Sequence, residues 1–371
     1  MKKRILFLIH DLGPRGAEKV LVNLVNGMDR TLFDISVRTL FDWGPNRQAL
    51  SPDVHYSSWI CRDVPGNSHW MKLWTPEQIF KRIIPEDYDI IVSFLEGPCA
   101  RVVGGCPDNG TKVVNWIHIT MPSEEKFLEG FRNRKEAERC YGRADALVFV
   151  SGDVRDSFLK KYQAQKKTAV IYNVYESDRI RSIAVEEPSD PAIGKDTLNW
   201  CSAGRLLPVK GWKRMLKIQK RLVSEGIPAV FYLLGEGPQR KELEKMAEDL
   251  KITDSVVFAG YQMNPYAYMS RCILTACASF REGFSTMAVE SLLVGTPVCS
   301  VEVGGMKELL GENGEYGIVT ENDDEALYTA VRRFFVDESF RKLYQEKALE
   351  RGKFFDQAAS VRKAEELLLS L

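Results

Sequence analysis

Residues 198–206 read Leu198-Asn199-Trp200-Cys201-Ser202-Ala203-Gly204-Arg205-Leu206, and this stretch decides the fold of the second half of the chain. Its apolar run predicts a buried strand, and the loop Pro208-Val209-Lys210-Gly211 leads from it into a helix. Short apolar runs without alternation follow, as expected of parallel strands covered by helices on both faces. They lie at 229–234, 256–259, 273–276, 297–301 and 317–320. A doubly wound α/β domain is therefore predicted.

The first half of the chain repeats this pattern. Strands are expected at 5–9, 35–40, 90–95, 113–117, 146–150 and 169–172, and helices at 17–28, 124–143 and 153–162. Residues 176–197 are poor in large apolar groups, which is typical of an exposed connection between domains. The chain is thus predicted to form two doubly wound, Rossmann-like α/β domains that face a cleft. The two domains are predicted to span 1–175 and 198–352, with a linker at 176–197. A C-terminal helix is predicted over 353–371, and it could pack back on the N-terminal domain.

The composition excludes several classes of protein. The 371 residues include 51 Lys+Arg and 51 Asp+Glu, so no nucleic-acid partner is expected. The eight cysteines contain no C-x-x-C pair and the four histidines have no metal-ligand spacing, so we expect buried reduced thiols and no metal site. No apolar run reaches the ~18 residues that a membrane span requires. A cytoplasmic protein is expected.

Two stretches of the first half carry candidate binding residues. The expected strand at 5–9 runs through Gly13-Pro14-Arg15-Gly16 into a helix, where backbone N–H groups and the helix dipole suit an anion, although an ordinary turn explains the pattern equally well. The absence of G-x-G-x-x-G gives a nicotinamide or flavin little support, and we expect no cofactor. The stretch 42–85 combines tryptophans with cations, namely Trp43, Trp59, Trp70, Trp74, Lys72, Lys81 and Arg82. Such residues usually pack a loop onto its domain. The alternative is a surface that contacts lipid headgroups, where tryptophan and basic residues are favoured.

Two loops of the second half carry the strongest chemical signal. Arg205 and Lys210 follow a strand end, where two cations suit a diphosphate or, alternatively, are ordinary solvated surface charges. The segment 280–290 again joins a strand to a helix, and its glycine allows a ligand to approach the backbone closely. The residues expected to face a ligand in this segment are Glu282, Gly283, Phe284, Ser285, Thr286 and Glu290.

Taken in order, these segments resemble glycosyltransferase family 4, the retaining nucleotide-sugar glycosyltransferases of the GT-B fold. The resemblance covers nearly the whole chain, is sharpest from Gly204 to about Leu310, and is nearest to bacterial enzymes that build surface glycans. The matching segments are Gly16-Ala17-Glu18, Gly204-Arg205-Leu206, Lys210-Gly211, Leu234-Gly235-Glu236-Gly237-Pro238, Phe258-Ala259-Gly260-Tyr261, Asn264-Pro265-Tyr266, Glu282 to Glu290 and Gly295-Thr296-Pro297-Val298.

The resemblance also implies roles for single residues. Catalytic roles are implied for Glu282, His118, Arg205 and Lys210, with the two cations neutralising the donor's diphosphate and Glu282 contacting hydroxyls of the transferred sugar. His118 has an ordinary alternative as a histidine packed at a strand end. Further donor-binding roles are implied for the backbone of two glycines, Gly16 and Gly283, which allow the donor to approach closely. Backbone N–H donors are implied for Phe284, Ser285 and Thr286. Tyr261 is implied to lie at the base-binding loop, and Glu290 is implied to bind the ribose hydroxyls. Arg15 stands where relatives commonly have a second glycine, and it either contacts phosphate or points into solvent.

The activity that the resemblance implies is retaining, metal-independent transfer of a hexose or N-acetylhexosamine. The expected donor is a UDP-sugar, and the expected acceptor is a saccharide linked to polyprenyl diphosphate at the inner face of the plasma membrane, in surface polysaccharide synthesis. No D-x-D stands where a phosphate-bridging metal is expected, so protein cations would replace the ion. The alternatives are a GDP-mannose-dependent mannosyltransferase, a nucleotide-sugar epimerase on the same fold, and a non-enzymatic two-domain binding protein.

Overall fold

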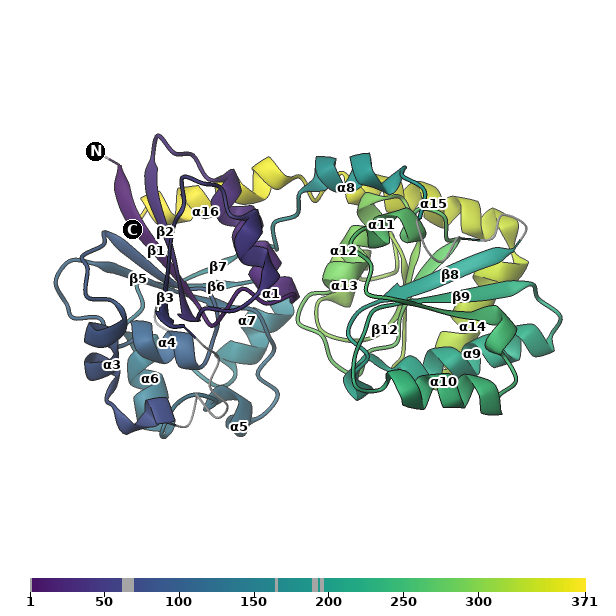
Figure 1. Ribbon diagram of the computed structural model, residues 1–371, viewed down its shortest axis with the longest axis horizontal. Helices are drawn as coiled ribbons and strands as arrows, with labels where there is room; N and C mark the ends of the chain where they lie inside the picture. Colours follow the sequence, from purple (N-terminus) through teal and green to yellow (C-terminus); the bar gives the residue numbers. More distant parts are fainter. Residues whose placement is uncertain (1, 62–69, 164–165, 189–192, 194–196) are drawn as a thin grey trace. The chain divides into compact units, whose positions relative to one another are not determined.

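The computed structural model describes residues 2–61, 70–163, 166–188, 193 and 197–371 (Figure 1). The chain forms two compact units. The first unit combines Met1–Tyr175 with Gln357–Leu371, and the second is Glu176–Asp356. Each unit has its own parallel sheet with helices on both faces.

The sheet of the first unit has seven parallel strands in the order β3-β2-β1-β4-β5-β6-β7. Its central strands are mostly apolar and almost entirely buried, because helices cover both faces. The strand order reverses between β1 and β4, where Ile5 is in register with Ile90. The strands are β1 (Lys3–Ile9), β2 (Phe33–Phe41), β3 (His55–Ile60), β4 (Ile90–Ser93), β5 (Lys112–Ile117), β6 (Ala146–Phe149) and β7 (Lys167–Val170).

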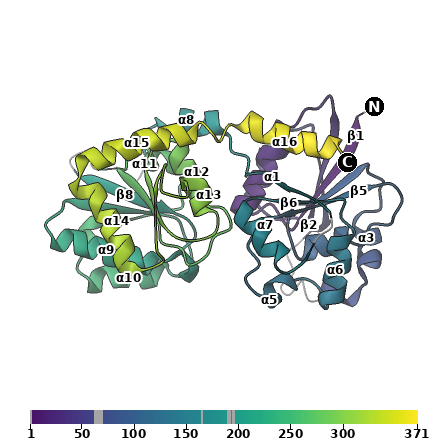
Figure 2. The same cartoon turned by 180° about the vertical axis from the view of Figure 1, so that it is seen from behind.

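Two helices from opposite ends of the chain lie side by side in the first unit (Figure 2). Val361 of the C-terminal helix packs close to Gly27, and Glu365 accepts a hydrogen bond from the backbone N–H of Asp29 at 2.6 Å. The helices of this unit are α1 (Gly16–Gly27), α3 (Pro76–Ile83), α4 (Pro98–Val103), α5 (Glu124–Phe127), α6 (Arg134–Gly142), α7 (Gly152–Leu159) and α16 (Gln357–Leu369), with short 3-10 turns η1 (Pro45–Ala49) and η2 (Met71–Leu73).

The sheet of the second unit has six parallel strands in the order β10-β9-β8-β11-β12-β13. The order reverses between β8 and β11, where Trp200 is in register with Leu274. Trp200 is fully buried, and its ring stacks on that of Phe231 with centroids 4.2 Å apart. The strands are β8 (Leu198–Ala203), β9 (Ala229–Leu234), β10 (Val256–Gly260), β11 (Leu274–Cys277), β12 (Val298–Val301) and β13 (Ile318–Thr320).

The helices of the second unit form one layer on each face of its sheet (Figure 1). On one face lie α9 (Trp212–Ser224), α10 (Arg240–Asp249) and α14 (Asp324–Val336). The other face carries α8 (Ser177–Ala184), α11 (Pro265–Met269), α12 (Thr286–Leu293), α13 (Met306–Leu310) and α15 (Glu338–Gly352). The remaining turns are η3 (Pro208–Lys210) and η4 (Thr253–Ser255).

The structure corrects three expectations. The connection expected at 176–197 begins with α8, whose Ile180 and Ala184 are buried and which packs against α11, so this part belongs to the second unit. Residues 189–192 and 194–196 of that connection lie outside the described residues. The single helix expected at 124–143 is two helices, because Gly130 has φ +88 and breaks the run. Strand β3 was not expected at all.

Candidate active site

The candidate site of the second unit lies where its strand order reverses, between β8 and β11. Ligands of doubly wound sheets bind at such a switch point, beyond the carboxyl ends of the strands. The loop after β8 packs against the end of β11, because Gly211 has φ +70 and a Cβ atom there would lie 2.0 Å from the carbonyl oxygen of Ala278. Any side chain at position 211 would force the two loops apart.

Lys210 and Glu282 meet across this switch point. The Lys210 Nζ lies 2.6 Å from Glu282 Oε1, although 72 positions separate the two residues in sequence. The Ser279 hydroxyl donates to the same carboxylate oxygen at 2.6 Å. The lysine expected to bind phosphate and the glutamate expected to bind the sugar therefore form one ion pair in the structure.

Arg205 lies on the same loop after β8 as Lys210 and is exposed. Among the residues that the structure describes, no group pairs with its guanidinium. Its backbone is fixed, since its carbonyl oxygen accepts a hydrogen bond from Trp212 Nε1 at 3.0 Å and the next N–H, of Leu206, donates to the carbonyl of Glu236 at 2.9 Å. The site thus presents an open, forked donor on a rigid loop.

Helix α12 begins in the loop after β11. Ser285 caps it, with the hydroxyl accepting a hydrogen bond from the N–H of Ala288 at 3.3 Å. Within the described part of the chain, the N–H of Thr286 makes no hydrogen bond, as is usual for the first turn of a helix. Phe284 is buried and Gly283 lies close to Gly305, where an added Cβ would sit 2.7 Å from the Gly283 carbonyl oxygen. The helix start is therefore held in place by packing on both sides.

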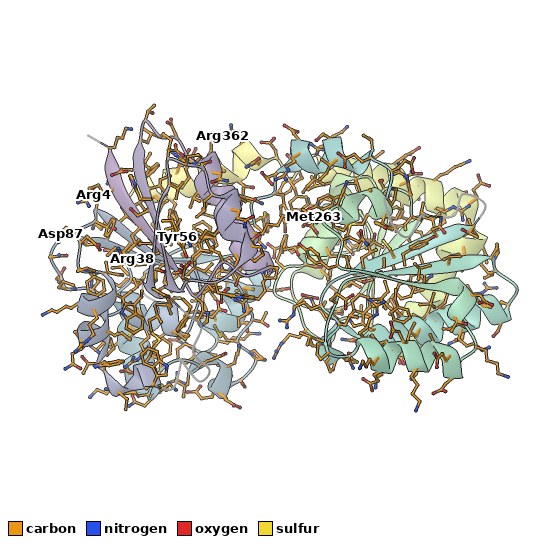
Figure 3. All side chains as sticks on the ribbon, viewed as in Figure 1. Arg4, Arg38, Tyr56, Asp87, Met263 and Arg362 are labelled. Carbon is orange, nitrogen blue, oxygen red and sulfur yellow. The ribbon has the colours of Figure 1, made fainter. Side chains whose placement is uncertain are left out.

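Two further expected residues lie on the same side of the second unit. The Glu290 carboxylate, about one turn into α12, accepts a hydrogen bond from the Tyr266 hydroxyl at 3.1 Å. Tyr261 follows β10 and is 66% exposed, and Met263, labelled in Figure 3, is 90% exposed in the same loop. An exposed aromatic ring and an exposed thioether are suited to contact a planar base.

In the first unit, Gly16 begins α1 directly after Arg15. The Arg15 guanidinium donates to Asp11 and, at 2.8 Å, to Glu18, so it is held against the protein while the side chain remains 43% exposed. Burial works to raise the pKa of Asp11, but the hydrogen bonds that it accepts from His10, Arg15 and Gly13 lower that pKa to about 2. The loop is thus an ionic network that holds the start of α1.

His118 follows β5 and is buried, with 8% of its surface exposed. Its ring packs on Phe94 with centroids 4.8 Å apart, and Nε2 has no partner among the described residues. Burial lowers the pKa of His118 to about 3, so the imidazole is neutral at physiological pH. Its backbone N–H donates to Glu96 Oε2 at 3.0 Å.

Within the described ranges, no three His, Cys, Asp or Glu side chains gather as a potential metal-ion site. None of the helices built from those residues has the length and apolar character needed to span a bilayer.

Comparison with known protein families places the chain. Residues 14–179 match the family described as Glycosyltransferase Family 4, and residues 186–351 match Glycosyl transferases group 1. The chain belongs to these glycosyltransferases. The resemblance inferred from the sequence motifs is thereby confirmed.

One relative of this glycosyltransferase is the N-acetylgalactosamine-N,N'-diacetylbacillosaminyl-diphospho-undecaprenol 4-alpha-N-acetylgalactosaminyltransferase of Campylobacter jejuni. The two are 32% identical over 232 residues, which cover 62% of this chain and 61% of that enzyme. The chain therefore spans about three fifths of that relative.

Solved structures share the fold of this glycosyltransferase over its full length. HepE from Anabaena, in complex with UDP and glucose, has a TM-score of 0.78 at 21% identity and covers 100% of both chains. A sucrose-phosphate synthase from Thermosynechococcus elongatus has a TM-score of 0.80 at 17% identity, covering 100% of this chain and 99% of that one. The expected GT-B fold is confirmed.

Three residues of the glycosyltransferase site were missed by sequence reasoning. Ser279 and Tyr266 hold the carboxylates of Glu282 and Glu290, and Glu96 accepts from the backbone of His118. Tyr266 stands in the quoted segment Asn264-Pro265-Tyr266, so a signal for it existed. Ser279 and Glu96 lie two and three positions after buried strands, where such folds carry ligand contacts, but neither residue belongs to a motif quoted above.

Proposed function

We propose that this glycosyltransferase transfers a hexose or N-acetylhexosamine from a UDP-sugar to a lipid-linked saccharide, with retention and without a metal ion. The observation that carries the proposal is that the Lys210–Glu282 pair joins the loop after β8 to the loop that leads into α12 at the switch point of the second sheet, with Arg205 exposed on the same loop as Lys210. This set combines a forked cation, a point cation and backbone donors, which together suit a diphosphate.

In this proposal each residue has a defined task. Arg205 and Lys210 bind the diphosphate, together with the backbone donors from Gly283 to Thr286. Glu282 binds hydroxyls of the transferred sugar while it also neutralises Lys210. The remaining donor contacts are Glu290 with the ribose, Tyr261 with the base, and Gly16 with the phosphates through its backbone, and His118 lies near the reacting sugar.

The chemistry follows from the charges that develop during transfer. Breaking the bond between the anomeric carbon and the phosphate oxygen leaves negative charge on the diphosphate and positive charge on the sugar. Fixed cations and amide dipoles stabilise the first without reorganising, as in an oxyanion hole. We propose that the acceptor oxygen then bonds to the anomeric carbon on the face that the phosphate leaves, and that its proton passes to the phosphate oxygen. The anomeric configuration is retained.

Two comparisons support the donor and acceptor classes. The Campylobacter relative is named for transfer of N-acetylgalactosamine to a saccharide on diphospho-undecaprenol. HepE was solved in complex with UDP and glucose, and with UDP-glucose. We propose a UDP-sugar and a polyprenyl-diphosphate-linked acceptor on this support, with a role in surface polysaccharide synthesis. GDP-mannose remains the second candidate donor.

A panel of nucleotide sugars tests this function. The protein is mixed with UDP-glucose, UDP-galactose, UDP-N-acetylglucosamine, UDP-N-acetylgalactosamine or GDP-mannose. Nucleoside diphosphate release and the unfolding temperature are then measured. One UDP-sugar is expected to raise the unfolding temperature, since a ligand at 100 times its Kd stabilises a protein by about 2.7 kcal/mol. The same sugar is expected to be hydrolysed slowly at a rate that EDTA leaves unchanged. A response to GDP-mannose alone would reassign the donor, epimerisation without transfer would reassign the enzyme, and no response to any sugar would refute the proposal.

We also propose that residues 70–82 contact the membrane surface. Leu73 is 77% exposed in η2, and the cations Lys81 and Arg82 of α3 are exposed as well. The tryptophans of this stretch are less available, because the rings of Trp70 and Trp74 pack together with centroids 5.6 Å apart. The combination of one projecting apolar side chain with exposed cations suits an anionic headgroup layer.

Substitution of Leu73 by serine is expected to weaken binding to vesicles of phosphatidylglycerol and phosphatidylethanolamine several-fold, measured by co-sedimentation. The reason is the loss of its apolar area from the headgroup region. Leu343→Ser is the matched control, since Leu343 is 48% exposed on α15 of the second unit. Equal binding by both variants and the wild type would remove the membrane contact from the proposal.

A further inference from the structure

The switch point of the first unit contains a carboxylate without an assigned task. Strands β1 and β4 flank the reversal of strand order, and Glu96 follows β4 by three positions. His118 follows the neighbouring strand β5 directly. Both residues therefore lie at the carboxyl edge of this sheet, where doubly wound folds bind ligands.

The two oxygens of Glu96 have different surroundings. Oε2 accepts a hydrogen bond from the backbone N–H of His118 at 3.0 Å, which fixes the carboxylate in place. Among the described residues, no group of another residue is hydrogen-bonded to Oε1, and the backbone N–H of Glu96 itself also stabilises the charged carboxylate. Glu96 is partly buried, so part of this fixed residue remains accessible at the sheet edge.

The neighbours of Glu96 do not neutralise it by direct contact. The Lys126 ammonium on α5 lowers the pKa of Glu96 through its charge, but it forms its ion pair with Glu129. His118 is neutral, because burial lowers its pKa to about 3. Cys99 of α4 and Tyr141 of α6 stay protonated at neutral pH, since burial raises the pKa of both groups. Burial also raises the pKa of Glu96, whereas the hydrogen bond from His118 lowers it. A hydrogen-bond donor from outside the protein would complete the coordination of this carboxylate.

We propose that Glu96 binds a hydroxyl group of the acceptor saccharide, with Oε2 held by His118 and Oε1 accepting the hydroxyl proton. A sugar hydroxyl fits, because it is a neutral donor that needs no counter-charge. Hydrogen bonds to a charged partner are stronger than neutral ones, so this contact contributes to acceptor affinity and orientation. Glu96 is thus a specificity residue for the acceptor. This inference rests on the proposed sugar transfer.

The test separates acceptor use from donor chemistry in the full-length protein. Glu96→Gln, Glu96→Ala and wild type are assayed for UDP-sugar hydrolysis without acceptor and for transfer to octyl glycosides of glucose, galactose, N-acetylglucosamine and N-acetylgalactosamine. In Glu96→Gln, the amide oxygen still accepts from His118, so an N–H donor replaces the open acceptor. Both variants are expected to raise KM for the preferred glycoside about ten- to hundredfold while hydrolysis keeps its wild-type rate.

Glu129→Gln is the matched control, because Glu129 belongs to the same charge environment but is exposed and pairs with Lys126. Its KM is expected to stay at the wild-type value. In the wild type, kcat/KM for the glycoside is expected to fall on the acid side as Glu96 takes up a proton, and this fall should be absent in Glu96→Gln.

The possible outcomes discriminate between the proposals. Wild-type KM values in both Glu96 variants, or equal losses of hydrolysis and transfer, would overturn the role of Glu96 and leave sugar transfer intact. A wild type that neither hydrolyses nor transfers any of the sugars overturns the proposed function and this inference together.

Discussion

Replacing Arg205 with alanine is expected to lower the rate of sugar transfer about 10²–10³-fold while the protein remains folded. The guanidinium is exposed and has no partner among the described residues, so its removal leaves no buried group unsatisfied. The loop itself is held by its backbone contacts with Trp212 and Glu236. Only the stabilisation of the leaving diphosphate is lost. The measurement is kcat/KM for the donor that the sugar panel identifies, together with the thermal unfolding curve.

Arg221→Ala is a suitable control, because Arg221 is a 43% exposed arginine of α9 in the same unit and pairs with Glu325. We expect this variant to keep wild-type activity. Arg205→Lys should recover part of the rate, since an ammonium retains the charge but loses the forked geometry. Wild-type rates in Arg205→Ala would refute the assignment of the diphosphate site.

Lys210→Ala extends the same test, with a different consequence for its partner. Removal of the ammonium leaves Glu282 with the Ser279 hydroxyl, so an uncompensated carboxylate stands where the diphosphate is expected to bind. Lys210→Ala alone is expected to lose more donor affinity than the double variant Lys210→Ala/Glu282→Gln. The reason is that the double variant also removes the carboxylate charge that would repel the diphosphate.

Replacing Arg101 with methionine is expected to lower the free energy of unfolding by about 3–5 kcal/mol. Arg101 is 1% exposed and pairs with both carboxylate oxygens of Glu136, at 3.0 and 3.1 Å. It also donates to the carbonyl oxygens of Met71 and Trp74, at 3.0 and 2.6 Å. The substitution leaves a buried carboxylate and two carbonyl groups without this partner, which is far costlier than losing a surface pair.

Denaturant unfolding measures this effect, with one transition followed for each unit because a chain of two units need not unfold in one step. The loss is expected in the transition of the first unit. Arg134→Met is the control, since Arg134 makes comparable contacts with Glu124 and Glu138 at 47% side-chain exposure and should cost less than about 1 kcal/mol. Equal effects of the two substitutions would contradict the argument.

The strands were the best-predicted part of the fold. Continuous apolar runs such as that of β9, expected and found at 229–234, are typical of strands buried on both faces. Strand β3 was missed because it lies at the edge of its sheet, where its side chains are only half-buried and no such run is needed. The break at Gly130 depends on a positive φ that composition alone does not reveal.

The sequence predicted which residues belong to the candidate site better than it predicted the contacts between them. Arg205, Lys210 and Glu282 stand out because each follows an expected strand. The ion pair between Lys210 and Glu282 depends on which two strands are neighbours at the switch point, and the chain order of the strands does not specify that. Arg15 shows the same limit, since its two carboxylate partners became evident only from the structure.

The route of the chain through its two units determines how the protein can be divided. The second unit is one uninterrupted stretch, Glu176–Asp356, and can be cut out as a single polypeptide. The first unit is discontinuous, because α16 returns to it after the whole second unit has been made. A ribosome therefore finishes the second unit before the first has all its parts, and truncation of the last fifteen residues damages the unit that was begun first.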